Sequence, residues 1–238
     1  MPRYSNSKRY RTRRRYRSNR RVSGLINVPK YILDCYNLSN AALTEVPSVL
    51  NPVSGCTGCL SSPARGNAVT QRDGDRICME SIDLHILVSW SGVGTGQTLV
   101  IPTARVALVL DTMANGTTAV GTEVYDNTTS AQYTKTLCPR NYSNTTWYRV
   151  LKSAIINPAS TNAVISSTNV SEAVANALQL HWFVKLNDIP VKFLSSGTTA
   201  DIANVIDNAL HLVVWCNRVD SDTAGCYVSY CSRMKFVG

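Results

Sequence analysis

The stretch Arg76–Trp90, RICMESIDLHILVSW, decides the fold class of this 238-residue chain. From Ile82 to Trp90, a branched aliphatic or aromatic residue occupies every second position, with polar or smaller residues between them. A period of two is typical of a β-strand that buries one of its two faces. The sequence therefore predicts a long, half-buried strand at this point.

Further strand signals follow along the chain. They are apolar runs rich in β-branched residues, and most of them end at Asn, Asp, Gly or Pro, the residues that favour turns. The connections between them are rich in Ser, Thr, Asn and Gly, and helical periodicity is scarce. Strands are predicted at Ala104–Leu110, Trp147–Ile156, Leu180–Leu186 followed by Pro190–Phe193, Ala209–Asn217 and Gly225–Val237, with shorter candidates at Thr122–Tyr125 and Tyr133–Leu137.

About eight strands with long polar connections favour an all-β sandwich or barrel, which we assign to residues 68–238. Two segments have the pattern of short helices, Val170–Leu178 and Thr199–Ala209, with Ser171 and Asp201 as candidate N-caps. Residues 24–67 contain four prolines and no clear period. We expect this segment to be a linker that lies on the body, with room for one short helix.

The net charge of +9 is distributed very unevenly. Residues 1–30 hold 11 basic residues and no acidic one, whereas the remaining 208 residues hold 13 basic and 15 acidic residues. A near-neutral body thus follows a strongly basic arm. No run of about 18 apolar residues is present, so we expect no membrane insertion. The chain also opens with charge rather than an apolar h-region, so we expect no secretory signal peptide.

The basic arm, residues 1–23, should be disordered when alone, because its like charges repel and it has no apolar face to bury. Arginine outnumbers lysine nine to one there, and three tyrosines recur every six residues. Guanidinium groups grip phosphate, and tyrosine rings stack on exposed bases, so this composition favours single-stranded nucleic acid. RTRRRYRSNRR would also serve as a nuclear localisation signal. The candidate nucleic-acid-binding residues are Arg3, Tyr4, Lys8, Arg9, Tyr10, Arg11, Arg13, Arg14, Arg15, Tyr16, Arg17, Arg20 and Arg21.

Catalytic and metal-binding motifs are weak. Neither a G-x-S-x-G nucleophile motif nor a phosphate-binding loop occurs, so we expect a protein that is not an enzyme and has no cofactor. Cys56-Thr-Gly-Cys59 has metal-ligand spacing, but a structural zinc site needs a second pair. A loop with two thiols is therefore favoured.

Other candidate ligands are scattered. His85, His181 and His211 lie inside predicted strands, and we expect them to face solvent or to pack. Two acidic loops, with Asp73 and Asp75 in one and Asp220 and Asp222 in the other, offer an alternative site for a structural divalent cation between subunits, although solvated turns are the commoner outcome.

The order of these features resembles the coat proteins of small icosahedral viruses. Thr70-Gln71-Arg72-Asp73-Gly74-Asp75-Arg76-Ile77, running into a long alternating strand, is similar to the first strand of satellite tobacco necrosis virus-type coat proteins. ARVALVLD, WYRVLKSA and ALHLVVWCNR then follow in a similar order over residues 68–238. The Arg- and Tyr-rich opening resembles those of circoviruses and other small circular single-stranded DNA viruses.

This resemblance implies a capsid protein with a single eight-stranded jelly roll made of two four-stranded antiparallel sheets. It also implies that sixty copies form a T=1 shell in the virion, with single-stranded DNA favoured over RNA as cargo and assembly in the host nucleus. The sequence identifies no host receptor. One alternative is a non-capsid single-stranded nucleic-acid-binding protein with a β-barrel body, but such a body would carry the basic residues itself. The other is a secreted β-sandwich enzyme or lectin, which would need a signal peptide and a convergent polar site.

Overall fold

A computed structural model describes residues 29–37, 48–49, 59–91, 103–126, 136–157, 176–216 and 225–238, and every structural statement below refers to these residues. No helix among them is long and apolar enough to cross a membrane. Short helical turns occur at α1 (Gly121–Val124), Tyr142–Asn144 and Ile202–Asn204. The strands are β1 (Lys30–Asn37), β2 (Ser48–Val49), β3 (Arg76–Ser91), β4 (Ala104–Asp111), β5 (Tyr148–Ile156), β6 (Asn176–Phe193), β7 (Val205–Asp207), β8 (Ala209–Cys216) and β9 (Gly225–Val237).

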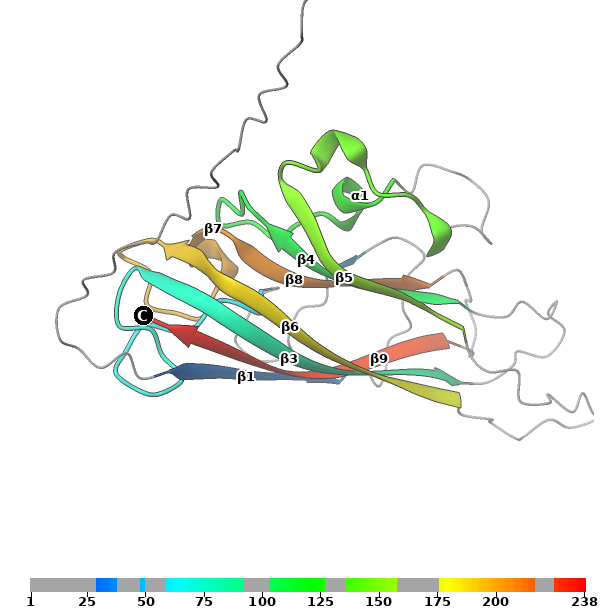
Figure 1. Ribbon diagram of the computed structural model, residues 1–238, viewed down its shortest axis with the longest axis horizontal. Helices are drawn as coiled ribbons and strands as arrows, with labels where there is room; N and C mark the ends of the chain where they lie inside the picture. The colour runs from blue at the N-terminus through cyan, green and yellow to red at the C-terminus, as the bar shows by residue number, and fades with distance from the viewer. Residues whose placement is uncertain are drawn as a thin grey trace, which may run out of the picture.

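The strands form two antiparallel sheets that stack face to face (Figure 1). One sheet has the order β1-β9-β3-β6-β7, and the other has the order β2-β8-β4-β5. If the three-residue β7 is set aside and the other eight strands are numbered along the chain, the sheets read 1-8-3-6 and 2-7-4-5. This is the strand order of a jelly roll. The all-β prediction of two antiparallel sheets is confirmed, and β7 adds a short fifth strand to one of them.

The start of the roll differs from the sequence-based interpretation. Strand β1 pairs with β9 along its whole length, and β2 pairs with β8. The first two strands therefore lie within residues 24–67, where we expected a linker with a short helix, and β3 is the third strand rather than the first. Local sequence does not show this, because β1 is mixed in polarity and pairs with a strand almost 200 residues away.

Three other segments also depart from expectation. Strand β6 continues through Asn187 and Asp188, where we expected a break between two strands. Both residues adopt positive φ (52° and 61°), which Asn and Asp tolerate better than most residues, so the strand continues past them. The strand expected at Thr122–Tyr125 is largely helix α1. Of the helix expected at Thr199–Ala209, only one turn forms, capped by the Asp201 side chain, which accepts from the Ala203 N–H. Two further expected segments are described only at their ends: residues 176–178 of the helix expected at Val170–Leu178 begin β6, and residues 136–137 of the strand expected at Tyr133–Leu137 form a helical turn, while 133–135 and 170–175 lie outside the described ranges.

The main core lies between the two sheets. The inward residues of β3, including Ile82, Leu84, Ile86 and Val88, are fully buried there against β4, β8 and β9. In β8, all eight residues are buried, because a second apolar cluster covers the outer face of the four-stranded sheet. Residues 112–126 and 136–147, which together we call the covering segment, contribute Val124 and Tyr125 to this cluster. Figure 1 shows its helix α1 on the far side of the four-stranded sheet from the main core.

Candidate functional site

The arm residues proposed to bind nucleic acid all lie in 1–23, outside the described residues. The described chain begins at Pro29 and enters β1, which is an edge strand of the five-stranded sheet. At this point the Lys30 ammonium group forms an ion pair with Asp73. The arm therefore joins the body at one edge of the five-stranded sheet, where a salt bridge fixes the start of the first strand.

The acidic loop at Asp73 and Asp75 is already neutralised by basic side chains. Asp73 pairs with Lys30, and one Asp75 carboxylate oxygen lies 3.6 Å from the Arg65 guanidinium and 3.8 Å from that of Arg72. Since a divalent cation needs carboxylates that are not already paired with cations, this arrangement does not favour the cation hypothesis for this loop. Asp220 and Asp222 lie outside the described residues.

Arg72, in the motif that resembles satellite virus coat proteins, has a structural role. Its side chain is fully buried, its guanidinium donates to the backbone carbonyls of Gly74 and Gly197, and it lies 4.3 Å above the Phe193 ring centroid. Both terminal nitrogens of this buried guanidinium therefore have carbonyl acceptors, which offsets the cost of burying its charge, whereas Nε has no hydrogen-bond partner among the described residues. Arg72 therefore ties the loop before β3 to the turn after β6.

The Cys56/Cys59 pair is only half described, because Cys56 lies outside the described ranges. Cys59 is buried, and its sulfur lies 3.1 Å from the Ser61 hydroxyl oxygen. Burial raises the pKa of the Cys59 thiol above its usual value. Metals bind the thiolate form, so this environment favours a packed thiol over a zinc ligand.

The covering segment is held to the four-stranded sheet by Arg105. Its guanidinium donates to the backbone carbonyls of Thr136 (3.2 Å) and Cys138 (2.7 Å). The same group lies 4.3 Å from the Tyr125 ring centroid and 5.4 Å from that of Trp215, and the two rings are 4.7 Å apart. Hydrogen bonds and cation–π contacts thus converge on one side chain and fix the segment.

An acidic group lies at the margin of this covered face. Asp111 is almost fully buried at the end of β4, and its carboxylate accepts a 2.9 Å hydrogen bond from the Met113 N–H. The pKa of Asp111 is raised to about 6, chiefly by burial; the Met113 hydrogen bond opposes this rise, and the neighbouring Glu123 adds a smaller contribution to it. Tyr148 donates a 2.6 Å hydrogen bond to Glu123, and burial together with this bond raises the pKa of its hydroxyl.

Large apolar side chains are exposed on the covering segment. Of the large hydrophobic residues exposed in the described part of the chain, five belong to this one stretch. Exposed apolar side chains gathered on one element are typical of protein–protein contact surfaces. They are Met113, Val120, Leu137, Tyr142 and Trp147.

The outer face of the five-stranded sheet carries a group that the sequence analysis missed. Asp83 and His85 of β3 and His181 of β6 lie together there, with Asp83 two residues before His85. Two residues apart on a strand means the same face, so Asp-x-His was a readable signal. The pairing of His85 with His181 across β3 and β6 could not be read locally. As expected, His85 and His181 face solvent, while His211 is buried.

The N-terminal segment is rich in arginine, and the jelly roll that follows it has a net charge near zero. This combination is typical of one class of protein, the viral coat proteins. The sequence matches the geminivirus coat protein/nuclear export factor BR1 family over residues 2–237, and the chain belongs to this family. The prediction of a coat protein from a small circular single-stranded DNA virus is thereby confirmed. No curated protein matches the chain.

Proposed function

We propose that this coat protein assembles into a closed icosahedral shell of sixty copies and packages single-stranded DNA through its N-terminal arm. The observation that carries the proposal is the charge partition: 11 basic and no acidic residues in the first 30, and a slight excess of acidic residues in the rest. A polyanion then binds the arm, while the bodies pack without strong mutual repulsion.

Self-association is supported by the apolar side chains on the covering segment. Their exposure in a single chain is unfavourable, and burial against a second copy would remove them from water. In a closed shell, symmetry repeats one such contact around every axis, so a modest interface is multiplied. The covering segment is therefore the first candidate for a contact between subunits.

Packaging by the arm is supported by composition and by its point of attachment. The first 23 residues hold nine arginines, which can bind phosphates, and three tyrosines, which can stack on bases. Neither interaction depends on the base sequence of the nucleic acid. The arm leaves the body at a sheet edge and can reach beyond it, since about 28 extended residues span roughly 90 Å. The same basic run supports entry into the host nucleus, and the family description also names a nuclear export factor.

Assembly is tested by purifying the full-length chain and measuring particle mass and shape. Sixty copies of a 26.0 kDa chain give particles of about 1.6 MDa, visible as uniform spheres by negative-stain microscopy. Mass photometry would count the copies. A monodisperse monomer at every salt concentration would overturn the shell and favour the alternative, a nucleic-acid-binding protein that acts without a capsid.

Packaging is tested by comparing three chains for the nucleic acid they protect from nuclease. Deletion of residues 2–21 should leave particles or folded subunits that protect little. A matched control with the nine arm arginines changed to lysine keeps the charge and should retain most binding, with the same steep salt dependence. Digestion of the released cargo with DNase or with RNase shows whether it is DNA or RNA. Equal protection by the deletion variant would refute the role of the arm.

A further inference from the structure

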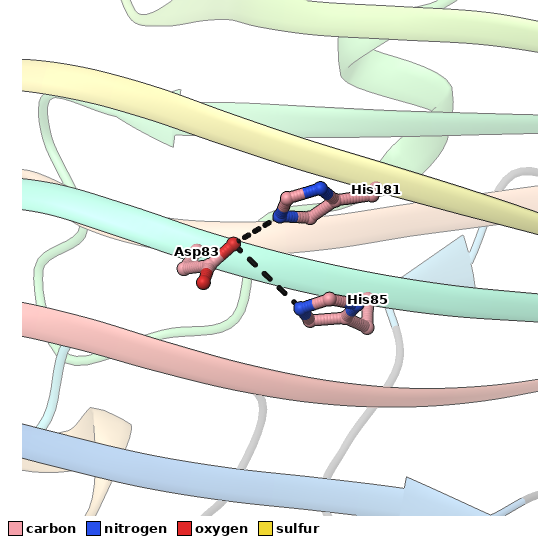
Figure 2. Close-up of side chains that lie close together, drawn as sticks. All are labelled: Asp83, His85 and His181. Carbon is pink, nitrogen blue, oxygen red and sulfur yellow. Dashed lines mark hydrogen bonds and ion pairs between the residues drawn. The ribbon is translucent and has the colours of Figure 1, made fainter.

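Three side chains that commonly ligate metals meet on the outer face of the five-stranded sheet. His85 of β3 and His181 of β6 are directly opposite in the antiparallel register, and Asp83 lies next to His85 on the same face of β3. Figure 2 shows the Asp83 carboxylate beside the two rings, with one ring nitrogen of each histidine directed toward the same carboxylate oxygen. All three side chains are partly exposed, so metal ions in solution can reach them.

The donor atoms are close to one another. One Asp83 carboxylate oxygen lies 2.6 Å from His181 Nε2 and 3.8 Å from His85 Nε2, and the three donor atoms all lie within 4.8 Å of one another. The two rings are stacked, with centroids 4.3 Å apart. Ligands of a tetrahedral Zn²⁺ at 2.0–2.2 Å are separated by about 3.4 Å. Each contact to Asp83 therefore differs from the required spacing by less than about 1 Å.

We propose that Asp83, His85 and His181 form a binding site for a borderline transition-metal ion of the Zn²⁺ type. The proposal does not depend on the shell or on the arm, because all three ligands belong to one chain and one sheet. Two imidazoles and one carboxylate are a ligand set that zinc accepts, and they leave a fourth position directed to solvent, where water completes the coordination.

Small rearrangements are enough to form the site. The rings rotate out of their stack so that both nitrogens face one point, and the hydrogen bond between His181 and Asp83 is replaced by two bonds to the metal. The side chains of His85 and His181 are 49% and 56% exposed, which leaves space on their solvent side for this rotation. The backbone needs no change, because β3 and β6 already hold the ligands in register.

The chemistry selects the class of metal. Two of the three donors are imidazole nitrogens, which suit Zn²⁺, Cu²⁺ or Ni²⁺, whereas Ca²⁺ and Mg²⁺ require oxygen ligands. A nearby thiol offers an internal comparison. Cys231 lies opposite His85 on β9 and is exposed, but it is not among the donors within 4.8 Å of one another. It shares the sheet face with the proposed site without belonging to it.

The test is equilibrium binding of Zn²⁺ to the full-length chain, with Cys56→Ser in every sample to remove the Cys56/Cys59 pair. We expect one Zn²⁺ per chain and no displacement by excess Mg²⁺ or Ca²⁺. Asp83→Asn, His85→Gln and His181→Gln should each weaken binding by at least about tenfold, the smallest effect expected for loss of a ligand. Zn²⁺ should also raise the melting temperature of the parent chain but not that of His181→Gln.

Matched controls are Cys231→Ser and Gln179→Ala on the same sheet face, both of which should bind Zn²⁺ as the parent does. Visible absorption of the Co²⁺-loaded parent chain, compared with that of the triple variant, provides a second readout that does not depend on stability. Equal Zn²⁺ binding by the triple variant would overturn the proposal. So would loss of binding in Cys231→Ser together with its retention in His181→Gln.

Discussion

The outer faces of the two sheets differ in how they meet the surroundings. On the four-stranded sheet, the covering segment and Arg105 bury a second apolar cluster around Tyr125 and Trp215. On the five-stranded sheet, the corresponding face leaves Leu87 and Phe183 exposed and holds the Asp83–His85–His181 group. One face is stabilised by packing within the chain, and among the described residues nothing covers the exposed side chains of the other.

The sequences of the strands already carry this difference. Strand β8, ALHLVVWC, is an almost unbroken apolar run and is buried on both faces. Strand β3 alternates, and its outward residues are exposed or half-buried. A continuous apolar run therefore predicts that something covers the far side of a sheet, whereas alternation predicts a bare face.

The largest effect is expected from the covered face. Trp215→Ala removes a fully buried ring that packs against Tyr125, and such truncations destabilise a protein by about 3–5 kcal/mol. Urea denaturation of the full-length chain would measure the loss of free energy of unfolding. A change below about 1 kcal/mol would show that the covering segment is not part of the cooperative fold.

An intermediate effect is expected at the margin of the covered face. The folded chain holds the Asp111 proton up to a pKa of about 6, against an ordinary value of 3.8, so this group favours the folded state increasingly as pH falls from about 6 to about 4. Above pH 6 the full penalty of the buried charge remains. A shift of about two units corresponds to roughly 3 kcal/mol at most.

Asp111→Asn removes this charge and still offers an oxygen to the Met113 N–H. The variant should therefore be more stable than the parent at pH 7.5, and the difference should shrink as pH falls toward 4. Denaturation curves at several pH values would measure the difference. Parallel pH profiles for the two chains would contradict the assignment of the raised pKa to Asp111.

The smallest effect is expected on the bare face. The Phe183 ring is 56% exposed, so Phe183→Ala should change the free energy of unfolding by less than about 0.5 kcal/mol. The same denaturation assay serves for the comparison with Trp215→Ala. A loss of similar size in both variants would mean that the two faces are equally covered, and the contrast between them would fail.

Much of the roll could be predicted from local patterns. Strands β3, β4, β5, β8 and β9 begin and end within a residue or two of the predicted segments, because alternation and apolar runs are local signals. Strand β1 was missed because an edge strand buries less and depends on a partner at the other end of the chain. The strand predicted at Thr122–Tyr125 is wrong for the three residues that belong to α1: Val124 and Tyr125 are buried against the four-stranded sheet, not by the period of their own element.

The candidate sites also differ in how far local sequence predicts them. The nucleic-acid-binding arm is predicted from composition alone, since charge density needs no partner, and it lies outside the described residues and stays a prediction. The Asp83–His85–His181 group depends on two features. The Asp-x-His spacing on β3 is local, whereas the pairing of His85 with His181 depends on the sheet. At Asp73 and Asp75, the spacing alone leaves a cation site and a solvated turn open, because the neutralising partners, Lys30 and Arg65, are brought there by tertiary contacts.

The pairing of β1 with β9 has a practical consequence for labelling. Lys30, where the arm joins the body, is in register with Phe236, two residues from Gly238. The start of β1 and the end of β9 thus lie side by side at one end of the five-stranded sheet (Figure 1). A peptide or fluorophore fused after Gly238 would emerge beside the root of the arm. In an assembled particle it would report which side of the wall the arm occupies.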